Sequence, residues 1–276
     1  MIKFSVITVS YNAGQKLLET VQSVLKQTYS DFEIIVKDAG STDSSVEALP
    51  KDERIRTIVE KDRGIYNGMN AALPYITGDY VLFLNCGDYL FSDDVFENLN
   101  AIIEQEETPC ELYYGDVFVR CRGGVISNKG KLTDYRLMSR TICHQTILFQ
   151  KSVFEQNAYL DSQFSLAADM ELYVRCLKKD RVQAKHIPMI VVNYEGGGVS
   201  ETVQHKKKIL NEKKQILEMH FTKKERLKVK LLKCITLKTL KEQVGSCALT
   251  YRFYEKIASL VSRRKNKNYG VNGQEK

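Results

Sequence analysis

The stretches SVITVSYN at residues 5–12 and IIVKDAGSTD at residues 34–43 decide the fold of this chain. Each is a short apolar run that ends in a polar turn, and residues 14–28 between them repeat leucine and valine at helical spacing. The order strand, helix, strand predicts two neighbouring parallel strands. Because open α/β sheets bind ligands beyond the carboxyl ends of their strands, we expect Tyr11 and Asp38 to lie at a binding edge.

Apolar runs and helical repeats continue to alternate along the rest of the sequence. Strands and helices in this order build a mainly parallel sheet with helices on its faces, so we expect an α/β fold. The expected strands are residues 2–10, 32–37, 54–60, 80–85, 112–120, 124–127, 146–150 and 187–194, and the expected helices are residues 14–28, 41–49, 64–76, 92–106 and 169–179.

Length and composition fit one sizeable α/β domain with an appendage. The chain has 276 residues, of which 43% are hydrophobic. Its longest apolar runs are strand-sized and fall short of the about 18 consecutive apolar residues that indicate a membrane span. No signal peptide is expected. Seven cysteines without a Cys-x-x-Cys pair predict reduced thiols in a cytoplasmic protein.

Charge divides the chain near residue 203. Residues 204–276 carry 20 Lys and Arg against 6 Asp and Glu, a net charge of +14, whereas residues 1–203 carry 21 against 28. We therefore expect a catalytic domain over residues 1–203 and a basic helical tail over residues 204–276, with disorder from Arg263 onward. The charge of this tail favours an anionic partner.

The tail repeats apolar residues at helical spacing among its lysines, at Leu227, Leu231, Cys234 and Ile235. A basic amphipathic helix of this kind suits an anionic membrane surface, which would make the protein peripheral on the inner face of the membrane. The alternative is a helix that packs on the catalytic domain and turns its lysines to water. Nucleic acid is not expected as a partner, because no recognition motif accompanies the charge.

Four stretches occur in the order seen in glycosyltransferase family 2. They are the two quoted above, EKDRGIYNGMN at residues 60–70 and FLNCGD at residues 83–88. The chain resembles this family, and within it a subset of bacterial polysaccharide enzymes. The resemblance implies the GT-A fold, with a nucleotide half over about residues 1–88 and an acceptor half over about residues 89–203.

The resemblance also implies a set of nucleotide-binding residues. The Tyr11 ring would pack on the nucleotide base, and the Asp38 carboxylate would accept a hydrogen bond from it. Each has a simpler alternative. Tyr11 could be a half-buried loop aromatic, Asp38 could bond its own turn, and Asp62 and Asn70 could cap or pack a helix. The full expected set is Thr8, Tyr11, Asp38, Asp62, Asn70 and Asn85.

The stretch from Asn85 to Asp88 stands where enzymes of the GT-A fold carry an Asp-x-Asp metal motif. A divalent cation there would neutralise the charge that develops on a nucleoside diphosphate leaving group. Asp88 is the only strong metal ligand in this stretch, and Asn85 could hold the ribose. We expect Mg²⁺ or Mn²⁺ as the cofactor.

Two later stretches bear on the acceptor. His144 and Gln145 precede a strand, and the resemblance implies that they face the acceptor or the diphosphate. Asp169 opens a helix where the family has its general base, the carboxylate that takes a proton from the attacking hydroxyl. The alternative for Asp169 is a helix cap, and Glu171 is the competing candidate for the base.

Together these features predict an inverting glycosyltransferase of cell-surface polysaccharide synthesis. It would transfer a sugar from a nucleotide diphosphate sugar, with a UDP-sugar favoured, to a saccharide or lipid-linked saccharide acceptor. Two alternatives remain open. A sugar-phosphate nucleotidyltransferase would need a Gly-rich phosphate loop, which residues 11–16 match poorly. A non-catalytic nucleotide-sugar-binding protein would explain why Asn85 and Gly87 stand in the metal motif.

Overall fold

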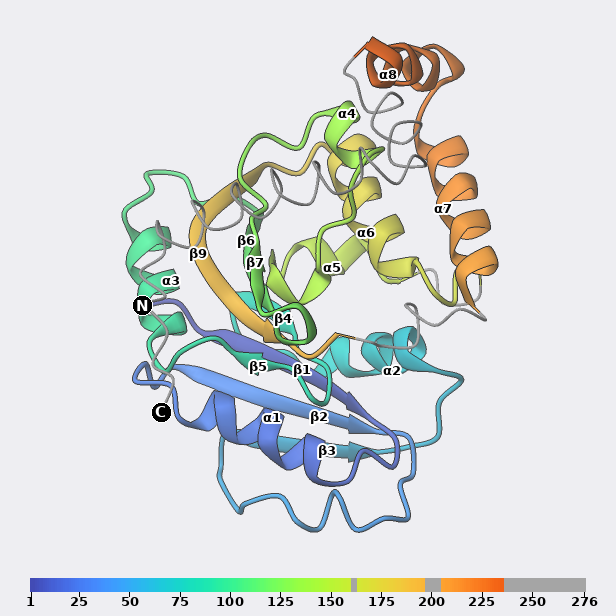
Figure 1. Cartoon of the computed structure of the whole chain (residues 1–276). Helices are drawn as coiled ribbons and strands as arrows, with labels where there is room; N and C mark the ends of the chain where they lie inside the picture. The colour runs from blue at the N-terminus through green and yellow to red at the C-terminus, as the bar shows by residue number, and fades with distance from the viewer. Residues whose placement is uncertain (160–162, 197–204, 236–276) are drawn as a thin grey trace. The chain divides into compact units, whose positions relative to one another are not determined.

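The computed structural model describes residues 1–159, 163–196 and 205–235, and its core is a single mixed sheet (Figure 1). The nine strands found in the described residues are β1 (Phe4–Ser10), β2 (Phe32–Asp38), β3 (Ile55–Val59), β4 (Tyr80–Phe83), β5 (Tyr89–Leu90), β6 (Leu112–Val119), β7 (Gly124–Ile126), β8 (Ile147–Gln150) and β9 (Ala184–Tyr194). Their order is β3-β2-β1-β4-β8-β6-β9-β5, with β7 paired to β6.

The first half of the sheet is parallel, as predicted. β3, β2, β1 and β4 pair in parallel, and every residue of β1 is buried. Strands that are buried on both faces have continuous apolar sequences, which is why the strands in this half could be predicted. Ser10 pairs with Asp38 in the register of β1 and β2, so these two strands end at the same edge.

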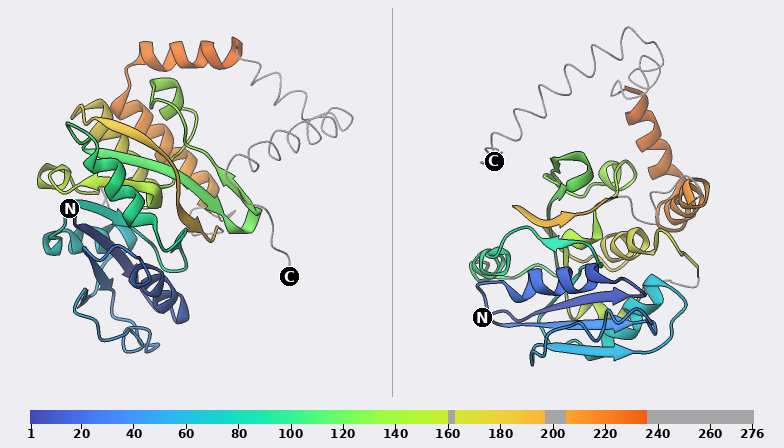
Figure 2. Two further views of the ribbon diagram at one scale, coloured as in Figure 1. Left: turned by 90° about the vertical axis from the view of Figure 1, so that its left-hand side faces the viewer. Right: turned by 60° about the horizontal axis from the view of Figure 1, so that its bottom comes forward.

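The second half of the sheet mixes directions. β8 runs antiparallel to both β4 and β6, whereas β9 runs parallel to β6. β9 is long and curved (Figures 1 and 2). β5 is a two-residue strand that the sequence did not predict, and it pairs antiparallel with β9 through Tyr89 and Asn193. This pairing brings the end of β9 beside the turn that follows β4.

Helices cover both faces of the sheet. α1 and α3 share one hydrophobic cluster with Phe4 and Val6 of β1, while α2 packs on β1 and β2. In α1 the apolar spacing buries Leu17, Val21 and Val24 on the sheet. The α-helices are α1 (Gln15–Leu25), α2 (Ile65–Ala72), α3 (Val95–Glu104), α4 (Asp134–Leu137), α5 (Val153–Gln156), α6 (Ala168–Lys178), α7 (Lys206–His220) and α8 (Lys223–Ile235); three short 3₁₀ helices are η1 (Leu73–Tyr75), η2 (Arg120–Arg122) and η3 (His144–Thr146).

The helix predicted over residues 41–49 is wrong, because this segment forms turns. The Asp38 carboxylate accepts hydrogen bonds from the backbone N–H and the hydroxyl of Ser41, at 2.7 and 2.5 Å. The same hydroxyl oxygen accepts from the N–H of Asn12 at 2.8 Å, and Ser44 has a positive φ of 58°. Polar side chains therefore satisfy the backbone locally and compete with a helix.

The chain forms two compact units, Met1–His220 and Phe221–Lys276. The charge pattern placed the division at residue 203 instead, and α7 accounts for the difference. Although α7 is rich in lysine, it buries Glu212 and Ile216 and packs on α6 in the first unit. The second unit contains α8, and the tail end for which disorder was predicted lies outside the described residues. Among the described helices, none is long and apolar enough to cross a membrane.

Candidate active site

A cleft of about 1220 Å³ lies in the first unit, beyond the end of β4. It brings together five residues that the sequence analysis singled out, and they come from three separate segments. Asn85 and Asp88 belong to the turn after β4, His144 and Gln145 to η3, and Asp169 to the first turn of α6. The other five predicted site residues, Thr8, Tyr11, Asp38, Asp62 and Asn70, are not part of the lining of this cleft.

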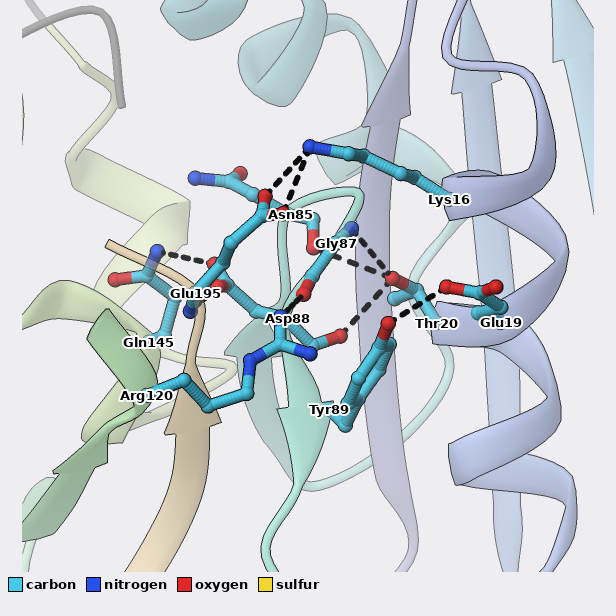
Figure 3. Close-up of polar contacts among 10 residues, drawn as sticks. All are labelled: Lys16, Glu19, Thr20, Asn85, Gly87, Asp88, Tyr89, Arg120, Gln145 and Glu195. Carbon is cyan, nitrogen blue, oxygen red and sulfur yellow. Dashed lines mark hydrogen bonds and ion pairs between the residues drawn. The ribbon is translucent and has the colours of Figure 1, made fainter. Parts of the chain in front are cut away.

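Asp88 is a buried carboxylate whose oxygens both accept hydrogen bonds. Its side chain is held by the amide of Gln145 at 2.8 Å and by the backbone N–H of Glu195, also at 2.8 Å (Figure 3). Burial raises the pKa of Asp88, and the hydrogen bonds from Glu195 and Gln145 offset this effect only in part. A divalent cation or another positive group would favour its ionised form.

The turn that carries Asp88 is braced from both sides, as Figure 3 shows. Thr20 of α1 accepts a hydrogen bond from the N–H of Gly87 at 2.9 Å and donates one to the carbonyl of Asp88 at 2.9 Å. Arg120 donates to the carbonyl of Gly87, and its guanidinium lies 4.4 Å from the centre of the Tyr89 ring. The position of Asp88 is therefore fixed by side chains that lie far apart in the sequence.

Lys16 and Glu195 form an ion pair at the edge of the same turn. The ammonium of Lys16 contacts the two carboxylate oxygens of Glu195 at 2.9 and 2.7 Å, and both residues line the cleft. Gly87 makes this approach feasible, because a Cβ on Gly87 would lie 2.7 Å from the Glu195 carboxylate. The sequence analysis missed Lys16, Thr20, Arg120 and Glu195. Only Glu195 had any signal, as the residue that opens a glycine-rich turn after a strand.

Asp169 also lines the cleft, and His144 and Tyr66 contact its carboxylate. The Tyr66 hydroxyl donates to one oxygen at 3.0 Å, and the His144 Nδ1 lies 3.5 Å from the other. Burial alone would raise the pKa of Asp169, but the interactions with His144, together with hydrogen bonds from the Met170 N–H and the Tyr66 hydroxyl, outweigh burial and lower it. Ala167 occupies the N-cap position of α6, so Asp169 is not the cap of this helix.

Glu171, the competing base, is engaged elsewhere. It is fully buried and is not part of the cleft lining. Its carboxylate pairs with Arg175 at 2.9 Å and with the Nε2 of His220 at 2.9 Å. Burial opposes the ionised form, but the His220 and Arg175 bonds lower the pKa of Glu171 overall. Its contacts are those of a structural ion pair.

The residues predicted for the nucleotide differ in exposure. Tyr11 is 67% exposed just beyond β1, whereas Asp38 is fully buried and bonds the turn that follows it. Thr8 is also buried, and its hydroxyl has no hydrogen-bond partner among the described residues. Tyr11 is thus free to meet a planar ligand, while Asp38 already performs the turn-bonding role that was its alternative.

Asp62 and Asn70 likewise make the structural contacts that were their alternatives. Asp62 accepts from the N–H of Gly64, at the start of α2, and pairs with the buried ammonium of Lys37 at 3.1 Å. The Asn70 amide bonds both the carbonyl and the N–H of Tyr159, at 2.9 and 2.8 Å. This clamp uses both ends of the amide to fix the segment beyond α5.

The chemistry of the turn after β4 fits a hard divalent cation with few protein ligands. No cluster of three His, Cys, Asp or Glu side chains occurs in the described residues. Asp88 offers one carboxylate, and the buried Oδ1 of Asn85 has no hydrogen-bond partner in the part of the chain described. Mg²⁺ commonly takes one or two carboxylates and completes its shell with substrate phosphates and water. Asp88 and Asn85 would suffice for such an ion.

Comparison with known families agrees with this geometry. The sequence model of the family described as Glycosyl transferase family 2 matches residues 5–153. The chain belongs to this family. It is therefore a glycosyltransferase, as its motifs predicted. The family-2 match covers the parallel half of the sheet, the metal-motif turn and η3, and it ends before Asp169.

Individual relatives extend the likeness. The PGL/p-HBAD biosynthesis glycosyltransferase of Mycobacterium bovis (strain BCG / Pasteur 1173P2) is 30% identical over 213 residues, which cover 74% of this chain and 81% of that protein. Chondroitin synthase of Escherichia coli is 28% identical over 196 residues, which cover 68% of this chain and 28% of that protein. This family-2 chain thus corresponds to most of the first relative and to one part of the second.

Solved structures confirm the GT-A fold. The mannosyltransferase PcManGT of Pyrobaculum calidifontis, in complex with GDP-Man and Mn²⁺, aligns with a TM-score of 0.58 at 14% identity, over 98% of this chain and 88% of that one. S. aureus TarS 1-349, in complex with UDP-GlcNAc, aligns with a TM-score of 0.55 at 17% identity, over 78% of this chain and 70% of that one. At these identities the likeness establishes the fold.

Proposed function

We propose that this family-2 enzyme is an inverting glycosyltransferase that moves a sugar from a nucleoside diphosphate sugar to a hydroxyl of a saccharide acceptor. The observation that carries the proposal is the Asp169 carboxylate, which has a lowered pKa and lines the same cleft as Asp88. A base that is ionised at neutral pH takes the acceptor proton as the hydroxyl attacks the anomeric carbon. A single displacement with one such base inverts that centre.

The donor is proposed to be a UDP-sugar. Tyr11 offers an exposed ring for stacking on the base, at the strand edge where Asp38 also lies. Thr8, Asp62, Asn70 and Asn85 remain proposed members of the nucleotide site. TarS was solved with UDP and with UDP-GlcNAc, which favours UDP, whereas PcManGT was solved with GDP-Man. A comparison of UDP-sugars with GDP-sugars decides between these bases.

The cofactor is proposed to be Mg²⁺ or Mn²⁺ held by Asp88, with Asn85 as a second oxygen ligand. When bound, the cation would neutralise the diphosphate as it leaves. The chain supplies Gln145 and the N–H of Glu195 to orient the Asp88 carboxylate. The Mn²⁺ complex of PcManGT supports a divalent cation at this kind of site.

The acceptor is proposed to be a saccharide, and a lipid-linked saccharide in particular. The lining of the cleft includes several apolar side chains that a free sugar would not need. These apolar lining residues are Val117, Val119, Ile126, Ile142 and Ile209. His144 contacts Asn85 and Gln145 bonds Asp88, so both lie beside the Asp88 turn, which suits contact with the acceptor or the diphosphate. The names of the relatives place them in glycolipid and polysaccharide synthesis, which is the role we propose here.

A cytoplasmic enzyme at the inner face of a membrane fits such an acceptor. α8 begins with a reciprocal cap, in which the N–H of Thr222 bonds the Glu225 carboxylate at 2.8 Å and the N–H of Glu225 bonds the Thr222 hydroxyl at 3.2 Å. The helix exposes Leu227 and Leu231 among its lysines. We propose that this second unit binds an anionic membrane surface.

A panel of nucleotide sugars tests the proposal. The purified enzyme is incubated with UDP- and GDP-sugars, with and without Mn²⁺, and with free or lipid-linked saccharides. A separate reaction contains a nucleoside triphosphate and a sugar 1-phosphate. Release of the nucleoside diphosphate together with a glycosylated product of inverted anomeric configuration, assigned by NMR, supports it. Release of pyrophosphate from a nucleoside triphosphate and a sugar 1-phosphate would support the nucleotidyltransferase alternative. Nucleotide binding without turnover under every condition would support the non-catalytic one.

A further inference from the structure

Glu212 is a buried carboxylate of α7 that binds the loop leading into α6. It is 4% exposed. Its oxygens accept hydrogen bonds from the backbone N–H groups of Ser165, Leu166 and Ala167, at 3.2, 2.8 and 2.9 Å, and from the Ser165 hydroxyl at 3.3 Å. A carboxylate removed from water is tolerated only when such donors surround it, so this contact is specific for an acidic side chain.

The loop that Glu212 binds ends at the N-cap of α6. Ala167 occupies that position and has no side chain able to cap the helix. The start of a helix carries unpaired N–H groups and a partial positive charge, which favour a carboxylate nearby. Glu212 supplies that carboxylate from a different helix. Asp169 lies only two residues beyond this N-cap.

A second contact fixes α6 at the other end of α7. The Nε2 of His220 lies 2.9 Å from the carboxylate of Glu171, which also pairs with Arg175 one turn further along α6. Between the two contacts, Lys213 of α7 donates to the Thr141 hydroxyl at 2.9 Å, and both of these residues line the cleft. α7 therefore holds α6 on both sides of Asp169.

We propose that Glu212 is a positioning residue for glycosyl transfer. This inference rests on the proposed function, in which Asp169 is the general base. Glu212 sets the start of α6 and thereby aims the Asp169 carboxylate at the acceptor hydroxyl, without touching substrate itself. A misplacement of about 1 Å at a reacting group can lower the rate by about 100-fold. Hydrogen bonds that set the N-terminus of α6 can therefore affect the chemical step.

The substitution Glu212→Gln tests this role, because it keeps the shape of the side chain but brings an amide N–H₂ against backbone N–H donors. We expect the kcat of transfer to fall by about 10- to 100-fold. The KM for the donor sugar and the affinity for its nucleotide should stay unchanged, because α6 and α7 carry no proposed donor contact. Amide hydrogen exchange of residues 165–167 should become faster. Gln215→Ala, at an exposed position of the same helix, is the matched control and should alter none of these quantities.

A double substitution separates positioning from a merely structural effect. If Glu212 acts through Asp169, adding Glu212→Gln to Asp169→Asn should lower kcat no further. Full additivity of the two losses would overturn the inference, and so would an unchanged kcat in Glu212→Gln when exchange at residues 165–167 has increased. A fully active Asp169→Asn enzyme would instead overturn the assignment of the base. The two failures are therefore distinguishable.

Discussion

The imidazole of His144 connects the two sides of the cleft. Its Nδ1 lies 3.5 Å from the Asp169 carboxylate, and its Nε2 lies 3.4 Å from the amide nitrogen of Asn85. One ring thus contacts both the helix that bears the proposed base and the turn that bears Asp88. Burial favours the protonated form of Asp169. The interactions with His144 are the largest of the effects that lower its pKa instead.

Removal of this ring should shift the pH dependence of catalysis. In His144→Ala, burial of Asp169 is opposed only by the hydrogen bonds from the Met170 N–H and the Tyr66 hydroxyl, so the pKa of Asp169 rises. The base is ionised only above that pKa, and the acidic limb of the kcat profile should move to higher pH. His144→Gln retains a hydrogen-bond donor without the charge and should shift the limb less. Transfer rates measured across pH check this, and an identical limb in His144→Ala would remove His144 from the control of the base.

Asp169→Asn should nearly abolish transfer while leaving the protein folded. The amide keeps the size of the carboxylate and one acceptor oxygen but cannot accept a proton, so we expect kcat to fall by about 10²- to 10⁴-fold. Thermal stability and nucleotide affinity should barely change. Glu171→Gln is the informative comparison, since it breaks the buried pairs with Arg175 and His220. It should lower the melting temperature, and a larger loss of kcat there than in Asp169→Asn would move the base to Glu171.

Asp88→Ala should remove the response of the enzyme to divalent cations. Wild-type transfer should rise with Mn²⁺ or Mg²⁺ and stop in EDTA, whereas the variant should stay inactive at any metal concentration because the only carboxylate of the turn is gone. Asp93→Ala changes an exposed carboxylate in the following loop and serves as the control. Wild-type activity that is indifferent to EDTA would contradict a metal at Asp88.

Tyr11 and Asp38 should respond differently to truncation. Tyr11→Ala removes an exposed ring, so it should lower nucleotide affinity by about 1–3 kcal/mol without lowering the free energy of unfolding. Asp38→Ala removes a buried acceptor of the turn at Gly40 and Ser41, so it should lower both. Titration calorimetry and thermal melts measure the two quantities, with Tyr75→Ala as an exposed-tyrosine control for affinity. Unchanged nucleotide affinity in both variants would mean that the nucleotide base binds away from Tyr11 and Asp38.

The parts of this molecule that were readable in the sequence are those with a local physical signal. The strands around residues 4–10 and 32–38 read as continuous apolar runs because both of their faces are buried. The helix expected over residues 41–49 failed because the Asp38 carboxylate binds the backbone donors of the following turn. These bonds are local, but the turn is also joined to the end of β1 by Asn12, which bonds Ser41 and Thr42 and lies outside any window around residues 41–49.

Long-range contacts explain what was missed at the site. Asn85, Asp88, His144, Gln145 and Asp169 were found because motifs mark them. Arg120 and Glu195 reach the Asp88 turn from 33 and 107 positions away. Arg120 has no sequence signal, and the glycine-rich turn that Glu195 opens does not point to Asp88. Glu212 was not identified from the sequence for a different reason. Its helix is so rich in lysine that charge alone assigned it to the tail, although one buried carboxylate ties it to α6.

The exposed leucines of α8 should decide whether the protein binds membranes. Leu227 and Leu231 are 58% and 55% exposed on a helix rich in lysine. Insertion of one leucine side chain into an apolar phase is worth about 1.5–3 kcal/mol, so replacing both with glutamine should weaken binding to anionic liposomes by at least about 100-fold. Electrostatic attraction between the lysines and anionic lipids adds to this, so wild-type binding should fall as salt rises and should be weak on zwitterionic vesicles.

The matched control is Leu210→Gln, which changes an equally exposed leucine on α7 and should bind liposomes as the wild type does. Cosedimentation at low and high salt measures all three proteins. Wild-type protein that stays in the supernatant at low salt, or a double variant that sediments like the control, would leave α8 with no part in membrane binding.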